Sequence, residues 1–134
     1  MRDWIALPRA EGTTSRQAQV IACDVHPLIN RRIQVYLRDV LRGGEEAGTG
    51  WMHHWIEEGF CALESRLAGD AETGRFCHGD APTLADACLV PQVFSARRYG
   101  CDLSPFPTIM RIHDACMGLE AFEEARPERQ PDAE

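Results

Sequence analysis

The tetrapeptide Thr83-Leu84-Ala85-Asp86 constrains the fold of this chain more than any other feature of its sequence. A Thr hydroxyl at a helix N-cap can accept a hydrogen bond from the backbone N–H three residues later, and an Asp at that third position can accept one from the Thr N–H. This capping box satisfies two donors that a helix start leaves unpaired, and an N-cap is worth about 1 kcal/mol. Because an apolar run from Ala87 to Ala96 follows directly, Thr83 and Asp86 predict the start of a helix.

Apolar residues with helical spacing also precede this point. From Ile21 to Val40 they recur every three or four residues, which predicts one long helix that Pro27 bends. A glycine- and glutamate-rich loop at 43–50 should end it, and a second pattern predicts a helix from Trp51 to Leu67. Gly59 lies in the middle of that helix, where glycine costs about 1 kcal/mol relative to alanine, so we expect a close backbone approach there.

The rest of the chain continues the helical pattern. The predicted elements are a helix from Thr83 to Arg98, a fourth helix introduced by Pro105 and Pro107, and a short fifth helix over Leu119–Glu124. No segment alternates with a period of two residues for long. We therefore predict an all-α fold of four to five helices, with a linker-like segment at 1–12, one helical domain at 13–126 and a tail at 127–134.

Bulk composition narrows the function classes. A chain of 134 residues is one domain, and its net charge of -7 argues against nucleic acid or an anionic membrane as partner. We expect no targeting signal, and no apolar run reaches the roughly 20 residues of a membrane span. The six cysteines show no Cys-x-x-Cys pair, which favours reduced thiols. We expect a cytoplasmic protein.

One candidate binding segment runs from Asp24 to Arg32. On a continuous helix, His26 and Asn30 would share a face, and Arg31 and Arg32 would point about 100° apart. An imidazole, an amide and two guanidinium groups suit a ligand with several carboxylates. The alternative is a solvated helix face beside a kink, and the pattern alone favours that alternative.

Other polar groups give weaker signals. Arg97 and Arg98 end the predicted Thr83 helix, where the helix dipole favours cations and where Arg98 could hold a carboxylate. His53 and His54 are adjacent and diverge on a helix, so they cannot chelate one metal ion. Cys77-His78 lacks a third orienting group for a nucleophile. We assign no metal ligand and no catalytic residue.

Motifs spread along most of the chain resemble the C-terminal domain of zeta-class glutathione transferases, the maleylpyruvate and maleylacetoacetate isomerases. The matching segments are Cys23-Asp24-Val25-His26-Pro27, Asn30-Arg31-Arg32, Gly59-Phe60, Gly79-Asp80, Thr83-Leu84-Ala85-Asp86, Leu89-Val90-Pro91-Gln92-Val93, Ala96-Arg97-Arg98, Pro105-x-Pro107 and Leu119-Glu120-Ala121-Phe122. Their order and spacing are specific. The His-Pro and Asn-Arg-Arg elements look more like the bacterial maleylpyruvate branch.

The resemblance implies a role in glutathione-dependent cis–trans isomerisation of an enediacid, in a cytoplasmic homodimer of aromatic amino acid catabolism. It implies that Arg98 and Arg32 bind the dicarboxylate substrate. It also implies that glutathione is bound by residues of the other segment, namely Asp24, Val25, His26, Asn30 and Arg31.

The family places a thioredoxin-like domain before its inter-domain linker, and this sequence resembles the family only from that linker onward. We therefore expect a piece of a longer enzyme, a product of a shortened gene, or a subunit that needs a partner, and we expect no catalysis by these residues alone. The alternative is a stand-alone helical interaction module without catalysis. A third, weaker hypothesis is a metal-binding helical domain.

Overall fold

The computed structural model describes residues 11–133, with side chains from Ser15 onward, and every regular element in that range is a helix. The elements are α1 (Glu11–Gln19), the π-helical η1 (Val20–Val25), α2 (His26–Ile29), α3 (Arg31–Asp39), α4 (Gly44–Gly69), α5 (Leu84–Arg98), α6 (Pro107–Met117), α7 (Glu120–Glu124) and the 3-10 turn η2 (Pro127–Arg129). The predicted all-α fold is confirmed. The predicted linker falls on residues that lie almost entirely outside the described range.

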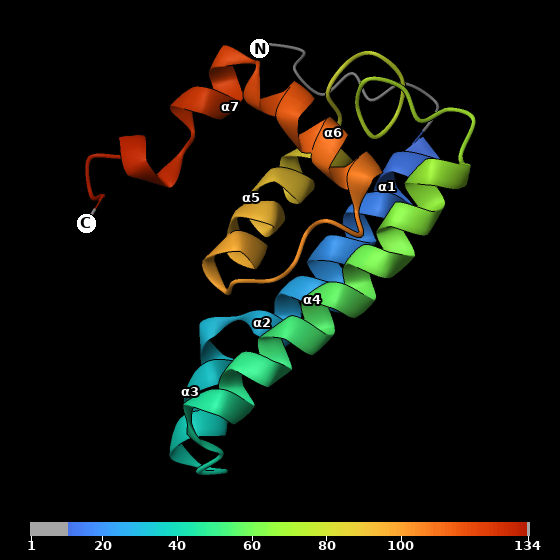
Figure 1. The fold of residues 1–134 in the computed structure, drawn as a ribbon. Coiled ribbons are helices and arrows are strands. Elements are labelled where there is room, and N and C mark those ends of the chain that lie inside the picture. Colours follow the sequence, from blue (N-terminus) through green and yellow to red (C-terminus); the bar gives the residue numbers. More distant parts are fainter. Residues whose placement is uncertain (1–10, 134) are drawn as a thin grey trace.

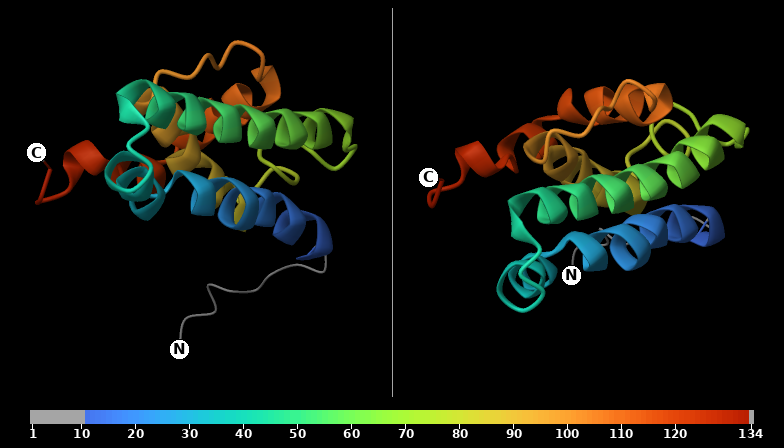
Figure 2. Two further views of the ribbon diagram at one scale, coloured as in Figure 1. Left: turned by 90° about the horizontal axis from the view of Figure 1, so that it is seen from below. Right: turned by 60° about the horizontal axis from the view of Figure 1, so that its bottom comes forward.

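Figure 1 shows how these elements are arranged. The stretch α1–α3 runs antiparallel along the long helix α4. Helix α5 packs against α1, and α6 packs against both α4 and α5. Two further views show α5 enclosed between α1 and α6, with α7 and η2 extending from the bundle (Figure 2). The chain therefore packs around α5, which the capping motif marks in the sequence.

The core consists of the apolar stripe of α5 and the residues that face it. Leu89, Val93 and Ala96 have no exposed surface, and neither do Ile56 and Phe60 of α4. Each large side chain buried in this way contributes about 1.5–3 kcal/mol relative to exposure. Because α5 packs against α1, η1 and α6 at once (Figure 1), the apolar run in this helix is nearly continuous.

The capping box forms at the start of α5, and Asp86 does more than cap. Its Oδ2 accepts hydrogen bonds from the N–H and the hydroxyl of Thr83, both at 2.7 Å, while its Oδ1 accepts one from Cys77 N–H at 2.9 Å. The Cys116 thiol of α6 lies 3.8 Å from the same Oδ1. Asp86 is fully buried. One carboxylate thus joins the 70–83 loop, α5 and α6.

The buried thiols beside Asp86 are held in their neutral form. Burial, followed by the charge of Asp86, raises the pKa of Cys116 to about 12. The same two causes, in the same order, raise the pKa of Cys77 still further. Both thiols therefore act as small apolar residues at neutral pH, and neither is activated as a nucleophile.

The prediction of one bent helix before residue 43 was wrong. The irregularity falls ahead of Pro27, as the π-helical η1, and the helix ends at Asn30, whose ψ of 165° is extended. Asn30 Oδ1 accepts from the N–H groups of Arg32 and Ile33 at 3.1 and 3.4 Å, and its Nδ2 donates to Pro27 O at 3.0 Å. Asn30 therefore caps a new helix, a role that asparagine favours and that hydrophobic spacing does not detect.

The second helix also starts earlier than predicted. Residues 44–50, expected as loop, form the first two turns of α4. Gly44, at φ +75°, makes the turn into the helix. The carboxylates of Glu45 and Glu46 in the first turn interact favourably with the positive end of the helix dipole. The expected close approach at Gly59 is confirmed, because a Cβ atom there would overlap Cγ2 of the buried Val25.

Candidate ligand-binding site

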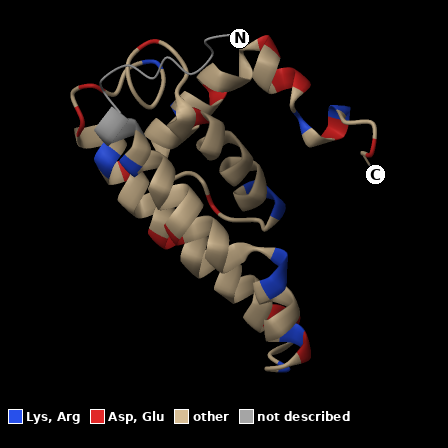
Figure 3. Cartoon of the chain, turned by 180° about the vertical axis from the view of Figure 1, so that it is seen from behind, with Lys and Arg blue, Asp and Glu red and all other residues tan. Residues whose placement is uncertain are grey.

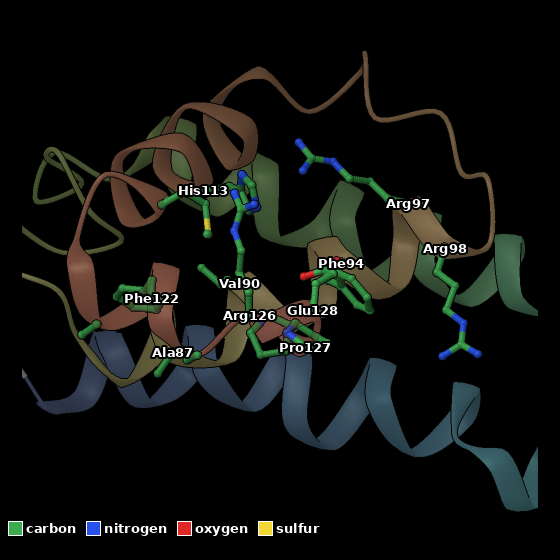
Figure 4. A pocket seen from close by; sticks show the side chains of 14 residues that line it. Ala87, Val90, Phe94, Arg97, Arg98, His113, Phe122, Arg126, Pro127 and Glu128 are labelled. Atoms are coloured by element: carbon green, nitrogen blue, oxygen red, sulfur yellow. The ribbon is translucent and has the colours of Figure 1, made fainter. Parts of the chain in front are cut away.

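A cavity of about 740 Å³ lies between α5, α6, α7 and η2 (Figure 4). Its volume falls in the range of about 300–1,000 Å³ that is usual for small-molecule sites. The apolar part of its wall is formed by Ala87, Val90, Pro91, Phe94, Met117, Ala121, Phe122, Ala125 and Pro127. Such a wall suits a ligand with an apolar body.

The charged part of the wall is mainly cationic. Arg97, Arg98 and Arg126 line the cavity against a single carboxylate, Glu128. The whole chain carries a net charge of -7, so this excess of positive charge is local. All 14 cationic side chains of the sequence are arginines, whose planar guanidinium can bind a carboxylate through two parallel hydrogen bonds. The cavity is therefore suited to an anion.

Arg98 occupies a well-supported position at the end of α5. Figure 4 shows Arg97 and Arg98 diverging, so that they reach different sides of the helix end. The next residue, Tyr99, accepts a hydrogen bond from Gln34 Nε2 on its hydroxyl, and its backbone oxygen lies 2.6 Å from His53 Nε2. These contacts tie the end of α5 to α3 and to α4, which fixes the base of the Arg98 side chain.

The predicted glutathione segment is divided by the fold. Asp24, His26 and Arg31 are exposed, and so is Arg32, the second predicted substrate residue. Val25 is only 1% exposed and packs against Gly59, so only its backbone is available to a ligand. The Asn30 side chain is engaged in capping α3. Because the helix breaks at Asn30, His26 and Asn30 do not share a continuous helical face as the sequence pattern suggested.

None of the residues of that segment lines the cavity beside Arg98. The two regions are nevertheless neighbours, because the Gln34–Tyr99 hydrogen bond joins α3 to the residue that follows Arg98. Figure 3 shows basic segments both at the end of α5 and in the α2–α3 region. The structure therefore offers two basic surfaces, one in the cavity and one exposed beside it.

Sequence reasoning missed the far wall of the cavity. Phe94, His113 and Phe122 follow helical patterns that indicate core packing rather than binding, and Arg126 and Glu128 lie at the predicted boundary of the tail. The spacing of Ala87, Pro91 and Phe94, on the side of α5 away from the core stripe, could have indicated a second apolar surface. No pattern in the sequence brings α7 and η2 onto that surface.

In the part of the chain that the structure describes, no group of three or more His, Cys, Asp or Glu side chains is arranged to bind a metal ion. Over the same residues, no helix combines the length and the apolar character that crossing a membrane requires.

Comparison with known proteins identifies the fold. No family model matches the chain. It is 45% identical to a maleyl pyruvate isomerase described as a bacterial zeta-class glutathione S-transferase in holo form, with a TM-score of 0.92 over 96% of this chain and 61% of that one. The fold is that of the C-terminal helical domain of a glutathione transferase.

Several relatives of the chain are named as isomerases. The chain is 49% identical over 116 residues to maleylpyruvate isomerase from Ralstonia sp, a match that covers 87% of this chain and 55% of that protein. A maleylacetoacetate isomerase from Methylobacterium extorquens AM1, solved with bound malonate and glutathione, is 37% identical with a TM-score of 0.91 over 96% of this chain and 60% of that one. The resemblance to zeta-class glutathione transferases is confirmed. The chain spans about half the length of the curated relatives it matches.

Proposed function

We propose that these residues form the substrate-binding helical domain of a glutathione-dependent cis–trans isomerase that acts on maleylpyruvate, maleylacetoacetate or a similar enediacid. The observation that carries the proposal is the position of Arg98 at the rim of a cationic, largely apolar cavity. The homologues named for this activity support it, as does the malonate, itself a dicarboxylate, bound to one of them.

In the proposed mechanism, Arg98 binds one substrate carboxylate. Its guanidinium would neutralise the dianion and stabilise the negative charge that develops on the substrate during the reaction. Glutathione, when bound, supplies the thiol that adds to the double bond. The residues described here would thus orient and hold the substrate, and a thiol-activating domain, in the same chain or in another, would be needed for turnover.

The residues predicted to hold glutathione fit this ligand only in part. Arg31 and His26 are exposed and could meet its carboxylates, whereas the Val25 side chain is buried and the Asn30 side chain is occupied. We therefore propose that glutathione contacts the exposed members of this segment and only the backbone of the buried ones. Homodimer formation, cytoplasmic location and a role in aromatic catabolism remain predictions of the resemblance.

Calorimetric titration with maleate and with glutathione tests the proposal. We expect the chain to bind maleate, and Arg98→Ala to weaken binding by about ten- to a hundred-fold, because a hydrogen bond to a charged group contributes about 1.5–3 kcal/mol. Arg38→Ala is the matched control, since Arg38 is an exposed arginine on α3 that pairs with Asp39 and lies outside the cavity. Equal maleate affinities of the two variants, or no binding by the parent chain, would refute the substrate-site assignment.

The second candidate function is a helical interaction module without catalysis. It is favoured by the exposed apolar side chains at the end of α3 and just beyond it, where Tyr36, Val40 and Leu41 are 52–59% exposed. Surfaces of this kind mark interaction sites when they are contiguous. Sedimentation analysis distinguishes the two candidates: self-association that Val40→Asp abolishes, together with no binding of maleate or glutathione, would favour the module.

A further inference from the structure

The inner end of the cavity holds a polar group that the proposed function does not use. His113 of α6 lines the cavity although it is only 6% exposed, and its Nδ1 lies 3.1 Å from Asp114 Oδ1. Only Nδ1 faces Asp114, which leaves the other ring nitrogen for a second partner. A largely buried imidazole in a largely apolar wall indicates a position for a polar ligand group.

Arg126 reaches the same place from the end of α7. Figure 4 shows its side chain extending along the cavity toward His113. Its Nε lies 2.8 Å from Glu123 Oε2, which anchors the side chain, and the other oxygen of the same carboxylate lies 3.0 Å from Arg129 Nη2. One carboxylate is therefore shared by two guanidinium groups. Glu123 therefore balances only one of these two positive charges.

The surroundings of this pair define the class of ligand. Val90 and Phe94 of α5 and Phe122 of α7 line the same cavity and present apolar surface. The nearby carboxylates are Asp114, which is largely exposed, Glu123, which is already shared, and Glu128 in η2. We propose that Arg126 and His113 form an anion-binding point that holds the carboxylate of a ligand whose apolar body lies against Val90, Phe94 and Phe122. This point goes beyond the proposed function, because it does not involve Arg98.

The test uses 3-phenylpropionate, which joins a carboxylate to an apolar ring, and its neutral isostere 3-phenylpropionamide. We expect the chain to bind the acid about ten-fold more tightly than the amide, and Arg126→Gln to remove that preference by weakening only the acid. Arg129→Gln is the matched control, because Arg129 shares Glu123 but does not line the cavity. It should change the affinity less than two-fold. His113→Gln should also weaken the acid more than the amide.

Three results would overturn the proposal: equal affinity of the parent chain for acid and amide, unchanged acid binding in Arg126→Gln, or no binding of either probe. Thermal unfolding of each variant confirms that it folds, and Arg126 is exposed enough for substitution to be tolerated. The outcome is separate from that of the maleate titration. If Arg98→Ala weakens maleate binding but Arg126→Gln leaves acid binding unchanged, only this inference is refuted. If Arg126→Gln weakens acid binding but Arg98→Ala leaves maleate binding unchanged, only the proposed function is refuted.

Discussion

Replacing Gly59 with alanine should destabilise the domain, although alanine is the better helix former. Gly59 lies in the middle of α4, where exchange for alanine alone would stabilise the helix by about 1 kcal/mol. A Cβ atom at this position, however, would overlap Cγ2 of Val25, which is 1% exposed and belongs to the π-helical η1. The two effects have opposite signs, so the measured sign shows which of them dominates.

The steric effect is the larger one. Valine has a stiff side chain with two branches at Cβ, and turning it would move Cγ1 into its other neighbours in the core. Overpacking of this kind costs about 1–3 kcal/mol, and the depth of the overlap at Gly59 places it near the upper end. After subtracting the gain in helix propensity, we expect a net loss of about 2 kcal/mol. For a domain of this size that lowers Tm by roughly 8 °C.

Urea unfolding followed by tryptophan fluorescence measures the effect, and the chain contains its own controls. Gly50 lies in the same helix with nothing within 4 Å of a Cβ atom, so Gly50→Ala should raise stability by up to about 1 kcal/mol. Val25→Ala removes the overlapping methyl group and leaves Val25 Cβ 3.4 Å from the new atom. The double variant should therefore be no less stable than Val25→Ala alone. Equal shifts for Gly59→Ala and Gly50→Ala would refute the close-contact argument.

Further predictions concern Asp86 and the thiols beside it. Asp86→Ala leaves buried donors without an acceptor and should lower the free energy of unfolding by about 3 kcal/mol, as measured with urea. Thr83→Ala should lower it by only about 1 kcal/mol. Equal losses would contradict the role of the Asp86 carboxylate in joining three parts of the chain. In the native state at pH 8, iodoacetamide should modify the exposed Cys61 but spare Cys77 and Cys116, as mass spectrometry of the digest would show. Because folding raises both buried pKa values, the unfolded chain loses these protons first, so the free energy of unfolding should fall from pH 9 toward pH 12 by about 1 kcal/mol per pH unit for each thiol. A flat profile in that range would show that these thiols are not protected.

The sequence predicts those parts of the fold that local chemistry specifies. The start of α5 follows from the pairing of Thr83 with Asp86, and the start of α6 follows from Pro107, which fits a first turn. The break at Asn30 could not be predicted from hydrophobic spacing, because the apolar stripe continues on both sides of it. It depends on an amide that caps α3 while donating back to Pro27 O. The early start of α4 depends on Gly44 at positive φ, and a glycine considered without its neighbours in space indicates a loop.

The candidate binding site is less predictable from the sequence than the fold. Arg98 could be placed from the end of its helix, since cations favour that end, and its neighbour Arg97 diverges from it as helical geometry requires. Arg126 and His113 could not be placed, because they come from elements that meet α5 only after the bundle has packed. Non-local contacts of this kind leave no periodic trace in the sequence.

The two faces of α5 link the core to the cavity. Leu89 and Val93 are fully buried in the core, whereas Val90 and Phe94, each one residue further on and hence about 100° around the helix, line the cavity. Pro91 has no N–H, so the carbonyl of Ala87 four residues earlier loses its usual helical donor, and both residues line the cavity. Each side chain of α5 points to only one of these two faces. Substitutions on the core face should therefore change stability, and substitutions on the cavity face should change ligand binding.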